Sequence, residues 1–253
     1  MRTRSNVLSY SRCDHKSKSS YFSPVKLASN GIIDTLSIDC VIFGFDNERL
    51  KILLVRHGEG ISKGKWGLPG GWIQYNEDLD QAAYRILNAL TGVHDIFLEQ
   101  LQAFGDVKRF PDERVITIAY KALIRSNAYD LVPGFTASEV QWFTLAQLPQ
   151  LIYDHSNILQ FGIRRLKHQV RHEPIGFNLL PEKFTLLQLQ NLYESILEQK
   201  LDKPNFRRKF MKMNLLISCE EKQKDVNHRA AKLYRFDKAV YDQLKESGFT
   251  FEF

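Results

Sequence analysis

Residues 71–93 read GWIQYNEDLDQAAYRILNALTGV, and this segment sets the architecture of the N-terminal half of the chain. It predicts one helix, because Glu77 and Asp78 suit the positive end of a helix near its start, and Gly92 stands where a helix should stop. Residues spaced i, i+3 and i+4 share one helix face. One such set consists of apolar residues: Ile86, Ala89 and Leu90. This face can pack, but it offers no oxygen ligand to a cation.

The same segment resembles the signature of the Nudix hydrolases, G-x5-E-x7-R-E-U-x-E-E-x-G-U, in which U is aliphatic. Six positions are in register with it: Gly71, Glu77, Arg85, Leu87, Gly92 and Val93. The three remaining glutamates of the signature are replaced by Ile86, Ala89 and Leu90. In the hydrolases such carboxylates hold Mg²⁺ against a diphosphate, and Glu77 alone makes a poor Mg²⁺ site. The resemblance therefore predicts a Nudix scaffold that is not an enzyme, with no catalytic residue, metal site or cofactor.

The composition is that of a soluble globular protein, with 43% hydrophobic and 25% charged residues among 253. No run approaches the ~18 apolar residues of a membrane span. Cys13, Cys40 and Cys219 are too few and too scattered for a disulfide framework or a zinc site. These features predict a cytoplasmic protein with no membrane partner.

Positive charge is concentrated at the two ends of the chain. Residues 1–30 carry six Lys or Arg against the single acid Asp14, together with eight serines, and predict a disordered basic tail with a weak DNA contact as the alternative. Residues 200–235 hold eleven Lys or Arg against four Asp or Glu, an excess larger than the net charge of +6 of the whole chain. The remainder of the protein is therefore close to neutral.

Hydrophobic patterning predicts strands and helices in alternation across residues 31–170. The predicted strands are 36–45, 50–56, 101–107, 115–124 and 140–143, and helices are predicted at 145–151 and 155–170, after the helix of the 71–93 segment. This order favours an α/β/α sandwich as the first domain. Overall we expect an α+β protein: a Nudix-like domain over 31–170, a linker over 171–183, and a second domain over 184–253.

The second domain has the pattern of a winged helix-turn-helix. Thr185 is a suitable N-cap for a helix with apolar residues at the 3.6-residue period, and Asp202 caps a second helix with Pro204 in its first turn. Apolar strands are predicted at 215–218 and 233–236, and a short helix near 238–246 closes the chain.

The second helix of this pattern carries a basic face, as expected of the helix that enters the major groove of DNA. The wing is the predicted ribbon of residues 215–236. We predict DNA contacts from the second helix, from the N-cap of the first helix and from the wing: Thr185, Lys203, Asn205, Arg207, Arg208, Lys209, Lys212, Arg229 and Lys232. Acidic residues are largely absent from these places. The alternatives are a solvated charged face, or an interaction module for RNA or a protein partner.

Together, the decayed Nudix segment and the C-terminal winged helix resemble the Nudix-related transcriptional regulators of bacteria. The marks of this resemblance are KGKWGLPGGWIQYNED at 63–78, Asp154-His155, PIGFNLLP at 174–181 and AKLYRF at 231–236. One branch of that family senses ADP-ribose and controls NAD metabolism, and the other senses sugars such as L-arabinose. The first strand, SIDCVIFGF at 37–45, and the linker GFNLLP look more like the arabinose type, so L-arabinose is the expected effector and ADP-ribose the alternative.

A pentose site needs a few carboxylates or amides and an aromatic platform. The candidate effector-binding residues are Asp39, Trp66, Trp72, Asp106, Arg109 and Arg114. Asp39 is singled out because it interrupts an apolar strand, where an unpartnered carboxylate is costly; an edge-facing or turn-bonded acid is the competing interpretation. Arg85 is expected to brace the loop that holds Glu77 rather than to contact the ligand. An ADP-ribose site would instead use basic groups, for which Lys108, Arg109 and Arg114 are available.

These inferences predict a bacterial repressor with a DNA operator and a small-molecule effector as its partners. Symmetric operators favour proteins with a two-fold axis, so we expect a homodimer. The enzyme alternative is a Mg²⁺-dependent Nudix hydrolase with a relocated metal site. Such a site would combine Glu77 with Asp78, Asp80 or Asp106.

Overall fold

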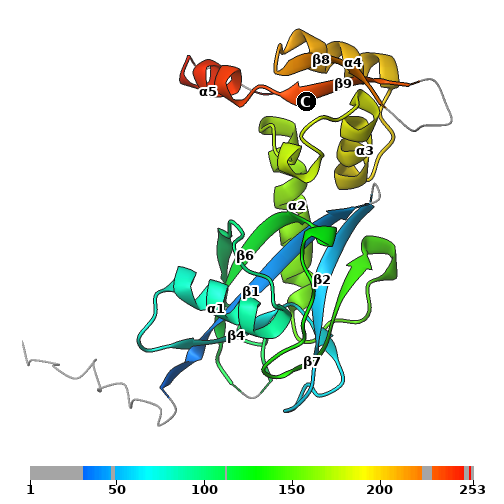
Figure 1. The fold of residues 1–253 in the computed structure, drawn as a ribbon. Coiled ribbons are helices and arrows are strands. Elements are labelled where there is room, and N and C mark those ends of the chain that lie inside the picture. The colour runs from blue at the N-terminus through cyan, green and yellow to red at the C-terminus, as the bar shows by residue number, and fades with distance from the viewer. Residues whose placement is uncertain (1–30, 47–48, 112, 224–229, 248–250, 252–253) are drawn as a thin grey trace, which may run out of the picture.

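The computed structural model describes residues 31–46, 49–111, 113–223, 230–247 and 251. Figure 1 shows a twisted sheet flanked by helices, with a smaller, mainly helical part and a two-stranded ribbon above it. The predicted tail, 1–30, and Arg229 lie outside the described residues. Within those residues, no helix combines the length and apolar character needed to cross a membrane.

The described residues of the N-terminal part form a seven-stranded sheet of order β3-β2-β1-β6-β5, in which β4 pairs with β1 and β7 pairs with β2. Its strands are β1 (Ile32–Asp46), β2 (Arg49–His57), β3 (Trp66–Gly67), β4 (Gly70–Gln74), β5 (Glu99–Phe104), β6 (Ile116–Arg125) and β7 (Ala137–Thr144). The central pair β1 and β6 is parallel, and the other pairs are antiparallel.

Helices cover both faces of this sheet. Side chains of a strand point alternately to its two faces, so each strand contributes residues to both cores. From β1, Ile38, Cys40 and Ile42 pack in the same core as α1 (Leu79–Thr91). Val41 and Phe43 pack in the opposite core, which contains α2 (His155–His172). The predicted α/β/α sandwich is therefore confirmed.

The ends of α1 follow from local chemistry. The Asp78 carboxylate accepts a hydrogen bond from the backbone N–H of Gln81 at 2.8 Å, and the Gln81 side chain accepts from the Asp78 N–H at 3.0 Å. Gly92 ends the helix with φ 75°, a left-handed conformation that glycine adopts without a Cβ clash. Ile86 and Leu90 are buried, so these replaced positions of the signature pack in the core.

The helix predicted at 145–151 is wrong. Only the short 3₁₀ turn η2 (Leu145–Gln147) forms, after which the chain is extended. Pro149 has no N–H and disfavours helical backbone at the residue before it. Leu151 instead makes a β-bridge with Trp66.

The C-terminal part has the element order of a winged helix: α3 (Leu186–Leu197), α4 (Lys203–Lys212), β8 (Leu216–Lys222), β9 (Lys232–Phe236) and α5 (Lys238–Glu246). Both predicted caps are confirmed, since Thr185 accepts from the N–H of Gln188 and Asp202 from the N–H of Asn205. This part of the fold agrees with the sequence pattern.

The predicted linker is packed rather than free. Helix α2 extends to His172, and Phe177, in the short turn η3 (Phe177–Leu179), stacks on Phe236 of the wing with ring centroids 4.1 Å apart. Arg125 at the end of β6 donates hydrogen bonds to the backbone carbonyls of Asn178 and Leu180, at 2.8 and 2.6 Å. The linker therefore ties the sheet to the winged helix.

The two parts also share one apolar core. It runs from residues of β1 and α2 into α3 and α4 of the winged helix. At the tip of the sheet, the N–H of Leu50 donates to the Ser195 hydroxyl of α3 at 2.8 Å. The winged helix thus packs directly on the part that contains the sheet.

Candidate functional site

A cavity of about 450 Å³ opens between β1, β4, α1 and the start of α2. Its lining combines buried polar groups, aromatic rings and an apolar wall. The lining includes Asp39, His57, Trp72, Arg85, Ile86, Ala89, Leu90, Arg109, Phe110, Phe135, Tyr153 and His155. Cavities of this size are typical of small-molecule sites, which fall at ~300–1,000 Å³.

The polar end of the cavity is a buried ionic cluster. Arg109, whose side chain is 3% exposed, places Nη2 3.2 Å from Asp39 and 2.9 Å from Asp154. Its Nε donates a second bond to Asp154 at 3.1 Å. His155 accepts the backbone N–H of Leu68 at Nδ1, so its Nε2 faces Asp39 at 3.4 Å.

Burial controls the protonation of this cluster. It raises the pKa of Asp39 from the usual 3.8 to about 7, because loss of solvation outweighs the opposing charge of Arg109. It also lowers the pKa of His155 from 6.5 to about 4. The imidazole is therefore neutral near pH 7, while Asp39 is close to its midpoint.

Gly70 makes room for the Asp39 carboxylate. The two residues are paired across β1 and β4, and a Cβ on Gly70 would lie 2.2 Å from Oδ1 of Asp39 and 2.8 Å from the carbonyl oxygen of Ile38. Only glycine allows this carboxylate to occupy the cavity wall.

The wall contributed by α1 is apolar. Ile86, Ala89 and Leu90 line it at the positions of the missing glutamates. Glu77 is held by Arg85, with bonds of 2.7 and 2.5 Å to its two oxygens, and these bonds keep the pKa of that carboxyl below its usual value. Among the described residues, no group of three His, Cys, Asp or Glu is placed to hold a metal ion.

Arg85 has the bracing role expected of it. Besides Glu77, its guanidinium contacts the carbonyl oxygen of Trp72 at 2.9 Å, which joins α1 to β4. Arg85 also lines the cavity. It is therefore a second positive group beside Arg109.

Aromatic side chains form another wall. The rings of Trp72 and Phe110 meet edge to face at 6.0 Å, and Phe110 and Tyr153 have centroids 4.6 Å apart. At the mouth, Phe135 is 87% exposed. His57 adds a polar atom to the lining. Its Nε2 is shielded from water and has no hydrogen-bond partner among the described residues. Burial lowers the pKa of this imidazole.

The structure brings together three of the six predicted effector-binding residues: Asp39, Trp72 and Arg109. Trp66 lies outside this cavity, with its ring packed edge to face on Phe143 at 4.9 Å. Asp106 and Arg114 are exposed and hold a turn, in which Arg114 donates to the Asp106 carbonyl. Asp39 is buried and ion-paired, so the edge-facing interpretation is wrong.

Sequence reasoning did not assign a role in the cavity to several residues that line it or hold its polar cluster. These are His57, Phe110, Tyr153, Asp154 and His155. The Asp154-His155 pair is visible in the sequence only as a mark of family resemblance. Its place opposite Asp39 depends on how α2 crosses the sheet.

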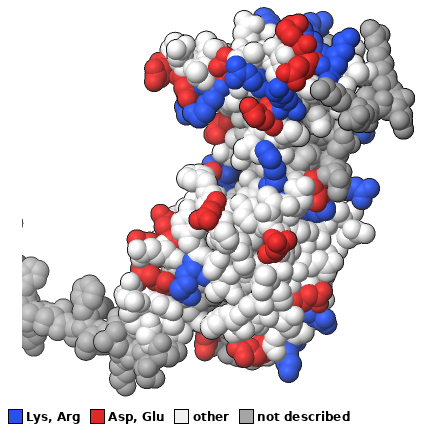
Figure 2. Space-filling view, in the orientation of Figure 1, with Lys and Arg blue, Asp and Glu red and all other residues white. Residues whose placement is uncertain are grey.

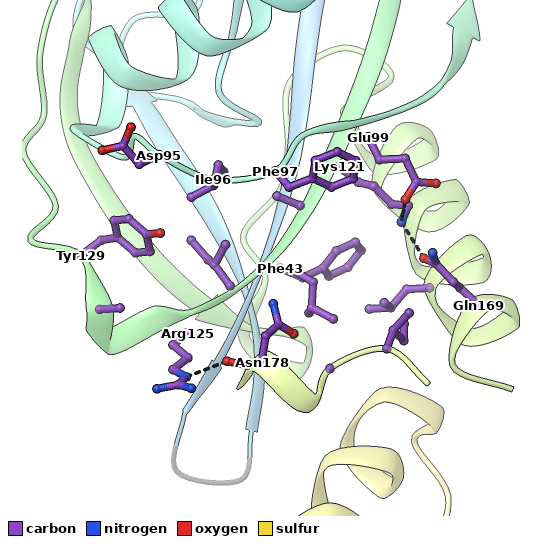
Figure 3. A pocket seen from close by; sticks show the side chains of 17 residues that line it. Phe43, Asp95, Ile96, Phe97, Glu99, Lys121, Arg125, Tyr129, Gln169 and Asn178 are labelled. Atoms are coloured by element: carbon purple, nitrogen blue, oxygen red, sulfur yellow. Dashed lines mark hydrogen bonds and ion pairs between the residues drawn. The ribbon is translucent and has the colours of Figure 1, made fainter. Parts of the chain in front are cut away.

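A second hollow, of about 550 Å³, lies at the junction of the two parts (Figure 3). Its charged groups already have partners. Lys121 contacts Glu99 at 2.8 Å and Gln169 of α2 at 2.7 Å, and Arg125 holds the linker carbonyl of Asn178. This hollow marks where α2, β6 and the linker meet.

The predicted DNA-contacting residues of α4 lie on its exposed side, opposite the buried Phe206 and Phe210. The exposed residues are Lys203, Asn205, Arg207, Arg208, Lys209 and Lys212. Figure 2 shows Lys and Arg gathered over the winged helix, with acidic residues among them. Lys232 of the wing pairs with Glu220 of β8 at 3.2 Å, so at least one acid lies in the wing, where acidic residues are expected to be largely absent.

Thr185 has a different role from the predicted one. It is 3% exposed, and its hydroxyl accepts a hydrogen bond from the N–H of Gln188 at 3.1 Å. Since this group is buried and engaged in capping α3, it is not available to a DNA phosphate. The expectation of a DNA contact at Thr185 is corrected.

Comparisons with known proteins match both parts. Residues 34–161 match the NUDIX domain, and residues 176–236 match the NrtR DNA-binding winged helix domain. The chain is 35% identical to the ADPR responsive transcriptional repressor NtrR of Acinetobacter baylyi, over 82% of this chain and 84% of that protein.

Solved structures show the same two-part architecture. Shewanella oneidensis NrtR in complex with a 27mer DNA is 30% identical and superposes with a TM-score of 0.68, covering 86% of this chain and 97% of that one. A MutT/nudix family protein from Enterococcus faecalis is 25% identical with a TM-score of 0.67, over 80% and 86% of the two chains.

Proposed function

Because this chain belongs to the family of DNA-binding transcriptional repressors that join a Nudix domain to an NrtR winged helix, we propose that its effector is ADP-ribose. The observation that carries the proposal is the similarity along most of the chain to the ADPR responsive repressor of Acinetobacter baylyi. In this proposal the Nudix domain binds ADP-ribose without cleaving it, and binding releases the winged helix from DNA.

The chemistry of the cavity supports this ligand. Adenine needs an aromatic wall, which Trp72, Phe110 and Tyr153 supply. A diphosphate needs positive donors, and Arg85 and Arg109 both line the cavity. The unpartnered Nε2 of His57 and the carboxyl of Asp39 are suited to ribose hydroxyls.

The apolar wall of α1 explains why the bound ligand would not be hydrolysed. Hydrolysis of a diphosphate in a Nudix enzyme relies on Mg²⁺, which polarises the phosphate and activates water. Ile86, Ala89 and Leu90 cannot hold that ion, and both Glu77 oxygens are bonded to Arg85. A ligand that is bound and left intact can act as a signal.

The comparisons do not support L-arabinose, and they favour the ADP-ribose alternative. The arabinose expectation rested on residues 37–45 and on the linker. Most of residues 37–45 are buried in the two cores, and only Ser37 and Asp39 of them line the cavity. The linker packs against the winged helix. Apart from Ser37 and Asp39, the residues of both stretches therefore have packing roles and do not line the cavity.

We propose that α4 enters the major groove and that the protein acts as a homodimer on a symmetric operator. The exposed basic side of α4 supports the first statement. The second follows from the two-fold symmetry that such operators share with their proteins.

A binding assay tests the effector. Fluorescence anisotropy would follow a labelled duplex, selected from a random library by the purified protein, as ligand is added. ADP-ribose should lower the affinity for DNA by about tenfold or more, a typical size for such coupling. Neither L-arabinose nor inorganic phosphate should do so.

Two phenylalanines provide a matched pair of variants. Phe110→Ala removes a ring from the cavity and should weaken the response to ADP-ribose. Phe143→Ala removes a ring that packs edge to face on Trp66, outside both this cavity and the second hollow, so the response should persist. Release of DNA by L-arabinose but not by ADP-ribose would overturn the ligand assignment. The assignment of the chain to its family would still stand.

A further inference from the structure

Helix α2 connects the cavity to the winged helix. At its start, Tyr153 and His155 line the cavity. Near its end, Lys167 forms an ion pair with Glu198, the residue that ends α3. Figure 1 shows α2 running from the sheet to the winged helix. Its 18 residues form a rod about 27 Å long, so a displacement at one end is carried to the other.

Asp154 stands at the N-cap of α2 but does not cap it. Each of the other four α-helices within the described residues has an N-cap side chain that accepts a backbone N–H. Both oxygens of Asp154 instead accept hydrogen bonds from Arg109. Arg109 thus draws the carboxylate away from the helix that it would otherwise stabilise.

The residue before it is held in an unusual conformation. Tyr153 has φ 47°, in the left-handed region that a residue with a bulky side chain rarely adopts. It is kept there by a 2.6 Å hydrogen bond between its hydroxyl and that of Ser62 and by its ring contact with Phe110. Such strain persists only where surrounding contacts hold it, and it is relieved if they shift.

Arg109 is therefore shared between the cavity and α2. It lines the cavity and holds Asp39 on the sheet and Asp154 on the helix. Carboxylate and phosphate oxygens accept the same paired N–H bonds from a guanidinium. A phosphate that enters the cavity and engages Arg109 competes with Asp154 for it.

We propose that Asp154 couples effector binding to DNA release: the diphosphate of the effector takes Arg109 from Asp154, and the freed start of α2 moves. This inference rests on the proposed function, because it requires an effector that carries phosphate. The displaced carboxylate can then cap α2, and the helix shifts against the sheet. At its other end, the shift alters the ion pair of Lys167 with Glu198 and the junction hollow that contains Gln169 (Figure 3).

The coupling has a thermodynamic signature. A ligand changes DNA affinity only if it binds two arrangements of the protein with different affinity. The bond between Arg109 and Asp154 belongs to one arrangement and is lost in the other. If the bond between Arg109 and Asp154 is weakened, Asp154 no longer competes with the phosphate for Arg109, so the effector binds more tightly. The arrangement that binds DNA, which contains this bond, becomes less favoured.

Asp154→Asn tests this coupling, since asparagine has the same shape and caps helices equally well. Calorimetry should show ADP-ribose binding about threefold or more tighter than in the unchanged protein. Anisotropy should show weaker DNA binding without ligand, and ADP-ribose should change it by less than about twofold, compared with the tenfold expected of the intact coupling. General damage to the fold would weaken both kinds of binding, so the tighter ADP-ribose binding is specific to the proposal.

Asp78→Asn is the matched control, because it makes the same change at the N-cap of α1, away from Arg109. It should leave both affinities and their ratio unchanged. If the unchanged protein responds to ADP-ribose and Asp154→Asn keeps the full response, the coupling role is overturned and the proposed function stands. If the unchanged protein does not bind ADP-ribose at all, the proposed function is overturned and the coupling role with it.

Discussion

Replacing His155 with asparagine should expose a pH dependence of stability that the buried cluster conceals. In the folded protein the pKa of His155 is about 4, against its usual 6.5, because the ring is buried. Between these values the unfolded chain binds a proton that the folded protein does not, so this residue makes the fold less stable as pH falls. At ~1.4 kcal/mol per pH unit, the loss across that interval is roughly 3 kcal/mol.

Asp39 acts in the opposite direction. Its pKa is raised to about 7 from the usual 3.8, so the folded protein binds a proton that the unfolded chain lacks over that interval. Stability therefore rises as pH falls through 7, by roughly 4 kcal/mol in all. Between about pH 6.5 and pH 4 the two slopes nearly cancel. The charged and titratable groups that interact with the ring are Asp39, Arg109, Asp154 and His57.

His155→Asn keeps an acceptor near Nδ1 for the N–H of Leu68 and removes the imidazole. Relative to the unchanged protein, the variant should gain about 2–3 kcal/mol of stability between pH 7 and pH 4.5, whatever constant cost the smaller side chain imposes. Urea unfolding at several pH values can be followed by tryptophan fluorescence, since Trp66, Trp72 and Trp142 all belong to the Nudix domain.

The control is His168→Asn, which makes the same substitution at an exposed position of α2. Its stability curve should run parallel to that of the unchanged protein. If the difference in free energy of unfolding between His155→Asn and the unchanged protein stayed constant from pH 7 to pH 4.5, the inference that the buried imidazole is neutral would be refuted.

Three shorter predictions concern the site, the fold and the DNA surface. With Mg²⁺ present, the protein should leave ADP-ribose intact by chromatography; turnover that disappears in Glu77→Gln would contradict the loss of the metal site. Gly44→Ala should destabilise the fold by ~1–3 kcal/mol in urea unfolding, because its Cβ would lie 2.6 Å from the Trp142 ring; an unchanged midpoint would argue against this packing. Arg207→Ala should weaken operator binding by ~1–3 kcal/mol if it contacts a guanine, with unchanged thermal stability. Equal affinity in a combined Arg207→Ala and Arg208→Ala protein would mean that the exposed side of α4 is only a solvated surface.

Helices with strong local signals could be predicted to within a few residues. Asp78 and Gly92 mark the ends of α1, and Thr185 and Asp202 mark the starts of α3 and α4. Capping and helical periodicity depend on neighbours within one or two turns, so the order of residues is enough. The error at 145–151 has the same origin, because the local effect of Pro149 outweighs an apolar pattern.

The candidate site was only partly predictable, because its residues are distant in the chain. Asp39 draws attention as an acid in an apolar strand, but its partner Arg109 is 70 residues away, and Asp154 is another 45 residues beyond Arg109. Trp66 and Trp72 look equivalent in sequence, yet one packs on Phe143 and the other lines the cavity. Which face a strand residue occupies depends on register, and register depends on the partner strands.

The order of residues alone was sufficient to show that apolar residues replace the three signature glutamates of α1 and that α4 is basic. Both follow from residue type and helical spacing, which no later packing can change. Packing was needed to show that Arg109 joins the cavity to α2, that Thr185 is buried, and that Lys232 is paired with Glu220. Those properties depend on which distant groups meet and on how much water remains around them, and a chain acquires both only when it folds.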